Sequence, residues 1–170
     1  MNKLFKFSGK EIFPVCLIFI LAFSRLIPHP PNFTPVIAVA IMSSFFFRNI
    51  YLSILVLAIS MLLSDIFVGF HKSMIFVYPS LLIINMVFFM VNEKINYKNL
   101  FVCSFIGSFM FYIISNFGFW AVEGLYEKNL NGLIQSYFMA IPFFKNTFLS
   151  TLIFSYTALL ANYFFKKSIN

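Results

Sequence analysis

The sequence predicts an all-α membrane protein with six transmembrane helices, and two observations carry this prediction. Of its 170 residues, 61% are hydrophobic and only 10% are charged, whereas soluble domains contain ~45–50% apolar and ~25% charged residues. The apolar segments are also far longer than the strands of a membrane barrel and lack strict alternation, which favours helices. No loop is long enough to form a separate soluble domain, so we expect a single integral membrane domain over residues 1–170.

Six apolar segments are the expected helices. They cover residues 12–27, 35–47, 50–68, 74–91, 100–121 and 146–165. The second is short, because at 1.5 Å per residue it reaches only roughly 20 Å of the ~30 Å hydrocarbon core. We therefore expect non-helical backbone beside it, covered by protein.

A further short helix is predicted between the fifth and sixth segments. Asn131-Gly132 is a turn signal, and residues 133–141 are semi-apolar and precede Pro142. We expect residues 133–141 to lie at the membrane interface and Asn146 to cap the sixth segment.

The basic residues predict that both termini are cytoplasmic. Eight of the twelve lie at one set of helix ends and four at the other, which the positive-inside rule assigns to the cytoplasm and the outside respectively. The N-terminal lysines before an apolar run resemble a signal peptide, but we expect an uncleaved first span. Scattered charges of this kind argue against nucleic-acid binding. The inner group is Lys3, Lys6, Lys10, Arg48, Lys94, Lys98, Lys166 and Lys167, and the outer group is Arg25, Lys72, Lys128 and Lys145.

Asp65 is the most informative residue, because it is the only acidic side chain within an apolar segment. A charge in a membrane span is costly unless it is paired or faces a cavity. Arg25 is expected at the same depth and is its predicted partner. Two interpretations stay open: a clamp that ties two helices together, or a pair that faces a ligand.

Other polar residues gather at the same predicted outer side. The loop from Arg25 to Pro35 contains four prolines and presents His29 and Asn32, and Thr34 can cap the second helix. His71 is predicted to be a solvated loop residue, and Asn85 to make an interhelical hydrogen bond. The candidate ligand-binding residues are Arg25, His29, Asn32, Asp65, Tyr78, Asn116 and Trp120.

Sequence motifs for common enzyme chemistry are absent. The chain contains no Walker A loop, no GxSxG and no HExxH. Cys16 and Cys103 lack CxxC spacing, so neither a zinc site nor a disulfide framework is expected. We predict no catalytic residue, no metal site and no cofactor.

Four sequence blocks resemble the signature of an uncharacterised family of small bacterial six-helix membrane proteins. They are Arg25-Leu-Ile-Pro-His-Pro-Pro-Asn-Phe-Thr-Pro35, Ser64-Asp65, Ser115-Asn-Phe-Gly118 and Ile141-Pro-Phe-Phe-Lys-Asn-Thr147. More remotely, in size and architecture, the chain is similar to the S components of energy-coupling-factor vitamin transporters, above all the solitary cobalamin-type members. Those proteins carry a cysteine shortly after their third helix, whereas residues 71–78 contain none here.

The resemblance implies a bacterial cytoplasmic membrane protein that binds a small vitamin-like solute from the outer side and helps move it inward. Its expected partners are membrane lipid, the solute and, unless transport is passive, energising transporter subunits. One alternative is a structural or assembly protein of the cell envelope, which would need no cavity. Another is an intramembrane lipid-modifying enzyme with His29 and Asp65 as acid and base.

Overall fold

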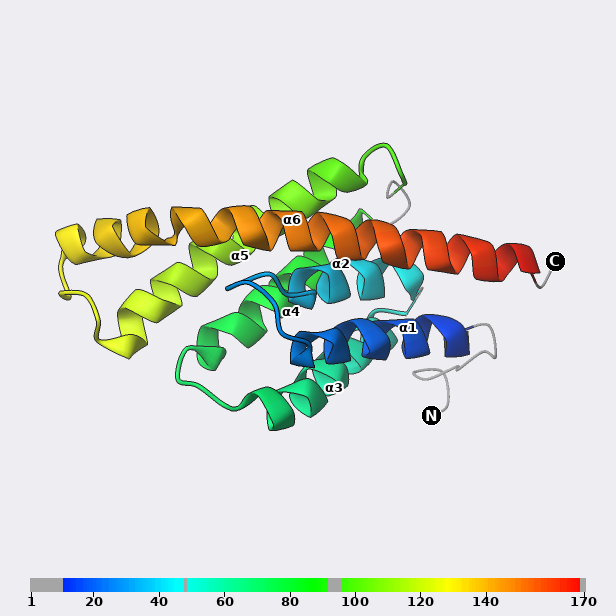
Figure 1. The fold of residues 1–170 in the computed structure, drawn as a ribbon, viewed down its shortest axis with the longest axis horizontal. Coiled ribbons are helices and arrows are strands. Elements are labelled where there is room, and N and C mark those ends of the chain that lie inside the picture. Colours follow the sequence, from blue (N-terminus) through cyan, green and yellow to red (C-terminus); the bar gives the residue numbers. More distant parts are fainter. Residues whose placement is uncertain (1–10, 48, 92–95, 169–170) are drawn as a thin grey trace.

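The computed structural model describes residues 11–47, 49–91 and 96–168, and within them the chain is all-α, as predicted. Six α-helices and one 3-10 turn follow one another along the described residues, without a strand (Figure 1). Lys3, Lys6, Lys10, Arg48 and Lys94 of the predicted cytoplasmic group lie outside the described residues. The elements are α1 (Ile12–Phe23), η2 (Ser24–Leu26), α2 (Val36–Phe46), α3 (Ile50–Val68), α4 (Met74–Met90), α5 (Leu100–Glu123) and α6 (Leu130–Ser168).

Three of these helices are long and apolar enough to cross a membrane: α3, α5 and α6. The helices α1, α2 and α4 are apolar but shorter. The prediction of a short second helix is confirmed, because α2 has only 11 residues, a length of about 17 Å.

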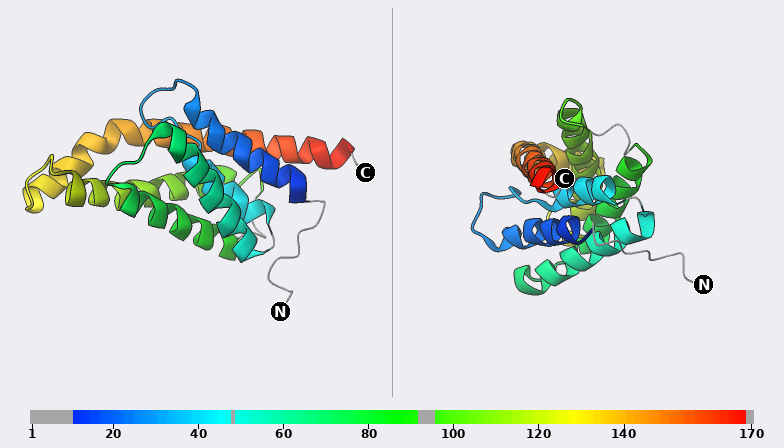
Figure 2. Two further views of the ribbon diagram at one scale, coloured as in Figure 1. Left: turned by 90° about the horizontal axis from the view of Figure 1, so that it is seen from below. Right: turned by 90° about the vertical axis from the view of Figure 1, so that its right-hand side faces the viewer.

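The short helix α2 forms the centre of the bundle. It contacts α1, α3, α4, α5 and α6, and the end view in Figure 2 shows the other helices around it. Every residue from Val36 to Ser44 is buried. A helix that is apolar on all sides is expected in such a fully enclosed position.

A buried amide, that of Asn85, joins α2, α3 and α4. The Nδ2 of Asn85 donates to the carbonyl oxygen of Ala40 (3.0 Å) and to the Oγ of Ser43 (2.9 Å). The Oγ of Ser53 donates to its Oδ1 at 3.2 Å. The predicted interhelical hydrogen bond of Asn85 is therefore confirmed, and it satisfies polar groups that neither lipid nor an apolar core could satisfy.

The prediction of a separate interfacial helix over residues 133–141 is wrong. A single helix, α6, runs for 39 residues through Pro142, a length of about 58 Å. Packing against α5 on both sides of the proline holds it together: the Tyr137 hydroxyl donates to the Ile113 carbonyl (2.7 Å), and the Phe144 ring lies 6.0 Å from that of Phe105. The tip of the α5–α6 hairpin projects beyond the other helices (Figure 1).

Asn146 does not cap a helix, because it lies inside α6. Its Nδ2 instead donates to the carbonyl oxygen of Pro31 at 2.9 Å. This bond ties the proline-rich loop to α6 and so positions the loop over the region described next.

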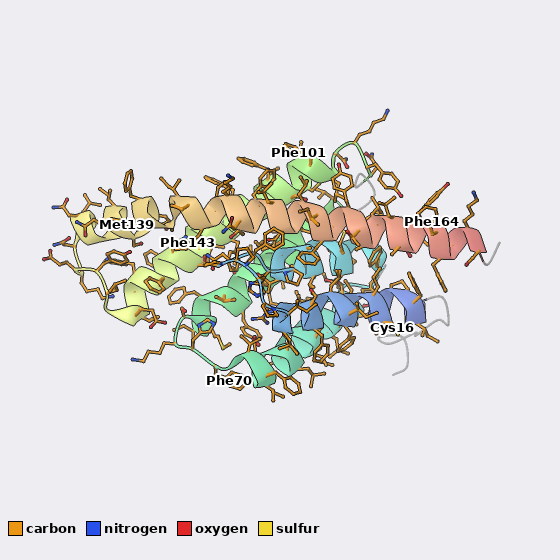
Figure 3. The ribbon with its side chains drawn as sticks, viewed as in Figure 1. Cys16, Phe70, Phe101, Met139, Phe143 and Phe164 are labelled. Carbon is orange, nitrogen blue, oxygen red and sulfur yellow. The ribbon has the colours of Figure 1, made fainter. Side chains whose placement is uncertain are left out.

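Apolar side chains cover the outside of the bundle. Phe101 and Phe164 point away from their helices in Figure 3 and are 52% and 62% exposed. A soluble monomer rarely exposes such a continuous apolar surface.

Candidate functional site

Arg25 and Asp65 form the predicted ion pair. Arg25 lies in the 3-10 turn after α1, and Asp65 lies in the last turn of α3 and is only 1% exposed. The Arg25 Nη1 is 2.6 Å from the Asp65 Oδ1 and donates to the Oγ of Ser64 at 2.8 Å. The Tyr78 hydroxyl donates to the Asp65 Oδ2 at 2.5 Å. The carboxylate is thus neutralised on one side and hydrogen-bonded on the other, as a buried charge requires.

One cavity adjoins Arg25, and a second cavity shares Asn32, Asn116 and Phe119 with the first. The Arg25 chamber, of about 260 Å³, lies among the α1–α2 loop, the α3–α4 loop, α5 and α6. Its lining residues are Arg25, Asn32, Thr34, Val36, Met61, His71, Ser73, Val77, Phe111, Ser115, Asn116, Phe119 and Thr147.

The second cavity, the hairpin chamber, has a volume of about 380 Å³ and a mostly apolar wall. It lies between α5 and the first half of α6. Its lining residues are Asn32, Asn116, Phe119, Leu125, Tyr126, Ser136, Met139, Ala140 and Phe143. A small cavity of about 40 Å³ is also lined by Asn32 and Asn116, so these two residues border all three spaces.

Asn32 and Asn116 each leave side-chain amide atoms without a partner at this junction, among the described residues. Asn32 has a φ of 59°, a left-handed conformation that asparagine tolerates better than most residues. Its side chain makes no hydrogen bond to any described residue. The Asn116 Nδ2 donates to the Tyr112 carbonyl oxygen at 2.7 Å, which leaves Oδ1 without a donor within the described part of the chain.

The other predicted site residues lie outside the chamber walls. Asp65 and Tyr78 stand behind Arg25 and position it. His29 is exposed, and its Nδ1 donates to the Pro30 carbonyl oxygen at 2.9 Å. The Trp120 Nε1 donates to the Glu127 carbonyl oxygen at 2.9 Å, and the Lys128 Nζ lies 5.2 Å from the Trp120 ring centroid. The structure therefore uses His29 within its own loop and Trp120 to secure the α5–α6 turn.

Several lining residues escaped the sequence-based search. His71 was expected to be merely solvated, but it lines the Arg25 chamber and shares a hydrogen bond of 2.8 Å with the Ser73 Oγ. The Ser73 backbone N–H donates to Glu123 Oε1 at 3.2 Å, which joins the α3–α4 loop to the end of α5. Ser115 had one signal, because it directly precedes Asn116. Thr147 also had one, because it ends the block from Ile141 that resembles the family signature.

The N-terminus of α2 borders the Arg25 chamber without a cap. Thr34 was expected to supply one, but no side chain caps this helix. The Val39 N–H donates to the Pro35 carbonyl oxygen at 2.8 Å. The N–H groups of Val36, Ile37 and Ala38 have no acceptor among the described residues, although all three residues are buried. Uncapped, buried N–H groups call for a partner from outside the helix.

Comparison with known protein families matches residues 5–169 to a family described as a family of unknown function (DUF6580). The chain belongs to this family. The match agrees with the expectation of an uncharacterised family. Neither a search of curated proteins nor a search of solved structures finds a significant match.

In this DUF6580 protein the geometry does not favour acid–base chemistry between His29 and Asp65. Both oxygens of Asp65 are engaged, by Arg25 and Tyr78, and His29 is bound to its own loop. Among the described residues no group of three or more His, Cys, Asp or Glu side chains could hold a metal ion. What the arrangement offers is a pair of cavities with a few fixed donors and acceptors.

Proposed function

We propose that this protein crosses the bacterial cytoplasmic membrane with six helices and has both termini in the cytoplasm. The apolar outer surface and the three long apolar helices support membrane insertion. The shorter apolar helices α1, α2 and α4 are the other three of the six proposed membrane helices. Because the other helices enclose α2, the chain beside it is covered by protein, and α2 need not span the hydrocarbon core alone. The positive-inside rule orients the Arg25 chamber outward.

We further propose that the protein binds a small, vitamin-like organic solute from the outer side and helps move it inward, as an S component does. The observation that carries this proposal is the pair of open chambers that meet at Asn32 and Asn116. Ligand sites combine a mostly apolar wall with a few placed polar groups and measure ~300–1,000 Å³. Both chambers have this composition; the hairpin chamber, at about 380 Å³, falls in this size range, and the Arg25 chamber, at about 260 Å³, lies just below it.

Open chambers distinguish this proposal from the two alternatives. A purely structural protein would fill the space with its own side chains, yet about 380 Å³ stays open in the hairpin chamber alone. An enzyme that used His29 and Asp65 would need both at one shared space, and neither lines a chamber. The sequence has no nucleotide-binding motif, so coupled transport would depend on partner subunits.

Ligand-induced stabilisation tests the proposal. The purified chain, in nanodiscs, would be heated with each member of a panel of water-soluble vitamins, because a ligand that binds only the folded state raises Tm. We expect at least one compound to raise Tm and to bind saturably by equilibrium dialysis. A panel in which no compound does either would contradict solute binding.

Two substitutions test whether the ligand binds in the chambers. Asn32→Gly removes the side chain but keeps the left-handed backbone accessible, and Asn116→Ala removes the second amide. Asn131→Ala is the matched control, because Asn131 is exposed in α6 and lines no chamber. Binding should weaken in the first two variants and stay unchanged in the control. Equal binding by all three would place the ligand elsewhere.

A further inference from the structure

We infer that the Arg25 chamber binds the carboxylate of a singly charged organic acid whose apolar body extends into the hairpin chamber. This inference rests on the proposed solute-binding function and names its substrate class. Its basis is the convergence of unpaired donors on one space that contains no competing acid.

Arg25 is the first of these donors. Its hydrogen bonds and its ion pair all pass through Nη1, to Asp65, Ser64 and a weak contact with the Met61 sulfur at 3.9 Å. Nε and Nη2 have no hydrogen bond within the described residues. The guanidinium is therefore held in place by Asp65 and Ser64 while part of its donor fork remains available. A planar fork matches the geometry of a carboxylate.

The N-terminus of α2 supplies a further hydrogen-bond donor to this chamber. Thr34 and Val36 line the same chamber as Arg25, and the Val36 N–H at this helix end has no acceptor among the described residues. An uncapped helix N-terminus carries partial positive charge and favours an anion. A short helix that begins within a transport protein commonly directs this end at the charged group of its substrate.

The remaining walls fit the same ligand. No Asp or Glu is among the residues that line the three cavities. The carboxylates of Asp65, Glu123 and Glu127 are engaged, by Arg25, by the Ser73 N–H and by the Asn129 side chain respectively. Phe119, Met139 and Phe143 give the hairpin chamber an apolar wall, which suits an uncharged hydrocarbon or ring body.

The charge balance favours one negative charge over two. Asp65 already neutralises Arg25, so the net attraction comes from the helix end and the oriented donors. A phosphate dianion would bring a second charge into a partly desolvated space with no further cation to pair it, at a high desolvation cost. A carboxylate matches the donors available.

A pair of isosteric variants tests the charge without disturbing the Arg25–Asp65 pair. Thr34 lines the Arg25 chamber, so Thr34→Asp adds a fixed negative charge there, and Thr34→Asn adds a side chain of the same shape without charge. The probes are biotin, lipoate and 3-phenylpropionate, each compared with its carboxamide, by Tm and equilibrium dialysis on the full chain in nanodiscs of neutral lipid.

We expect at least one carboxylate to bind the native chain at least about tenfold more tightly than its amide, as loss of a charge-assisted hydrogen bond predicts. Thr34→Asn should retain this binding and Thr34→Asp should lose it. Equal binding of acid and amide, or equal binding by both variants, would overturn the inference. If only neutral or cationic vitamins bind, the substrate class is wrong while the proposed function stands. If nothing binds, both fail.

Discussion

The Arg25 guanidinium and the Asp65 carboxylate lie 2.6 Å apart and join the end of α1 to the end of α3. Asp65 is almost completely buried, so its charge depends on this partner. The pair therefore sets both the stability of this end of the bundle and the orientation of the donor that faces the Arg25 chamber.

Removal of Arg25 alone should destabilise the protein strongly. Arg25→Gln leaves a buried, uncompensated carboxylate, and we expect a loss of about 3–5 kcal/mol. The double variant Arg25→Gln/Asp65→Asn removes both charges and should recover most of the loss. Thermal unfolding in detergent would measure both. Equal Tm values for the single and double variants would show that the buried charge is not the cause.

Tyr78→Phe should weaken the same cluster by a smaller amount. It removes the hydroxyl that donates to the Asp65 Oδ2, and hydrogen bonds to charged groups contribute ~1.5–3 kcal/mol. Tyr163→Phe is the control, because Tyr163 is 52% exposed and its hydroxyl makes no hydrogen bond to a described residue. A larger fall in Tm for Tyr78→Phe than for Tyr163→Phe would measure the contribution of the hydrogen bond to Asp65. Equal falls in Tm would show that this bond adds no stability.

Asn85→Ala should loosen the centre of the bundle. It leaves the Ser43 and Ser53 hydroxyls and the Ala40 carbonyl without their shared partner. We expect a destabilisation of about 1–3 kcal/mol, read as a lower Tm. Asn131→Ala, an exposed asparagine-to-alanine change, should leave Tm unaltered. A similar Tm for both variants would refute the structural role of the amide.

Gly118→Ala should disturb the contact between α5 and α4. A Cβ at Gly118 would overlap with the Cβ and ring of Phe76, so backbone must shift, at a cost of about 1–3 kcal/mol. Gly107→Ala in the same helix meets only outer atoms of the Ile41, Ile37 and Phe88 side chains, at 3.0–3.3 Å, and these atoms can move. Tm should fall more for Gly118→Ala. The reverse order would contradict this packing.

The proposed orientation predicts which loops are reachable from outside an intact cell. In a background with Cys16→Ser and Cys103→Ser, we would introduce single cysteines as Lys128→Cys in the α5–α6 turn and Lys98→Cys before α5. A membrane-impermeant maleimide should label Lys128→Cys in whole cells, and Lys98→Cys only after lysis. The opposite pattern would invert the topology.

The helices could be predicted well because apolar runs mark them directly. The segment predicted at residues 50–68 coincides with α3 (Ile50–Val68). The error lay at Pro142, where a local helix-breaking signal was overruled by contacts of Tyr137 and Phe144 with α5. A proline removes one hydrogen bond locally, whereas tertiary packing acts along the whole helix.

The candidate site could be predicted only in part. Arg25, Asn32 and Asn116 line the chambers, as a ligand-binding role requires. His29 and Trp120 do not, because nothing in their sequence neighbourhood reveals that nearby carbonyl groups, at Pro30 and Glu127, take up their donors.

The sequence by itself determined the apolar helices, the scarcity of charge and the pairing of Arg25 with Asp65, because a buried charge requires a partner and few were available. Only the tertiary structure decided that Asn32 and Asn116 meet at the junction of two chambers and that the N-terminus of α2 lies uncapped beside Arg25. Cavities and unpaired donors are properties of how helices pack, and packing depends on residues far apart in the chain.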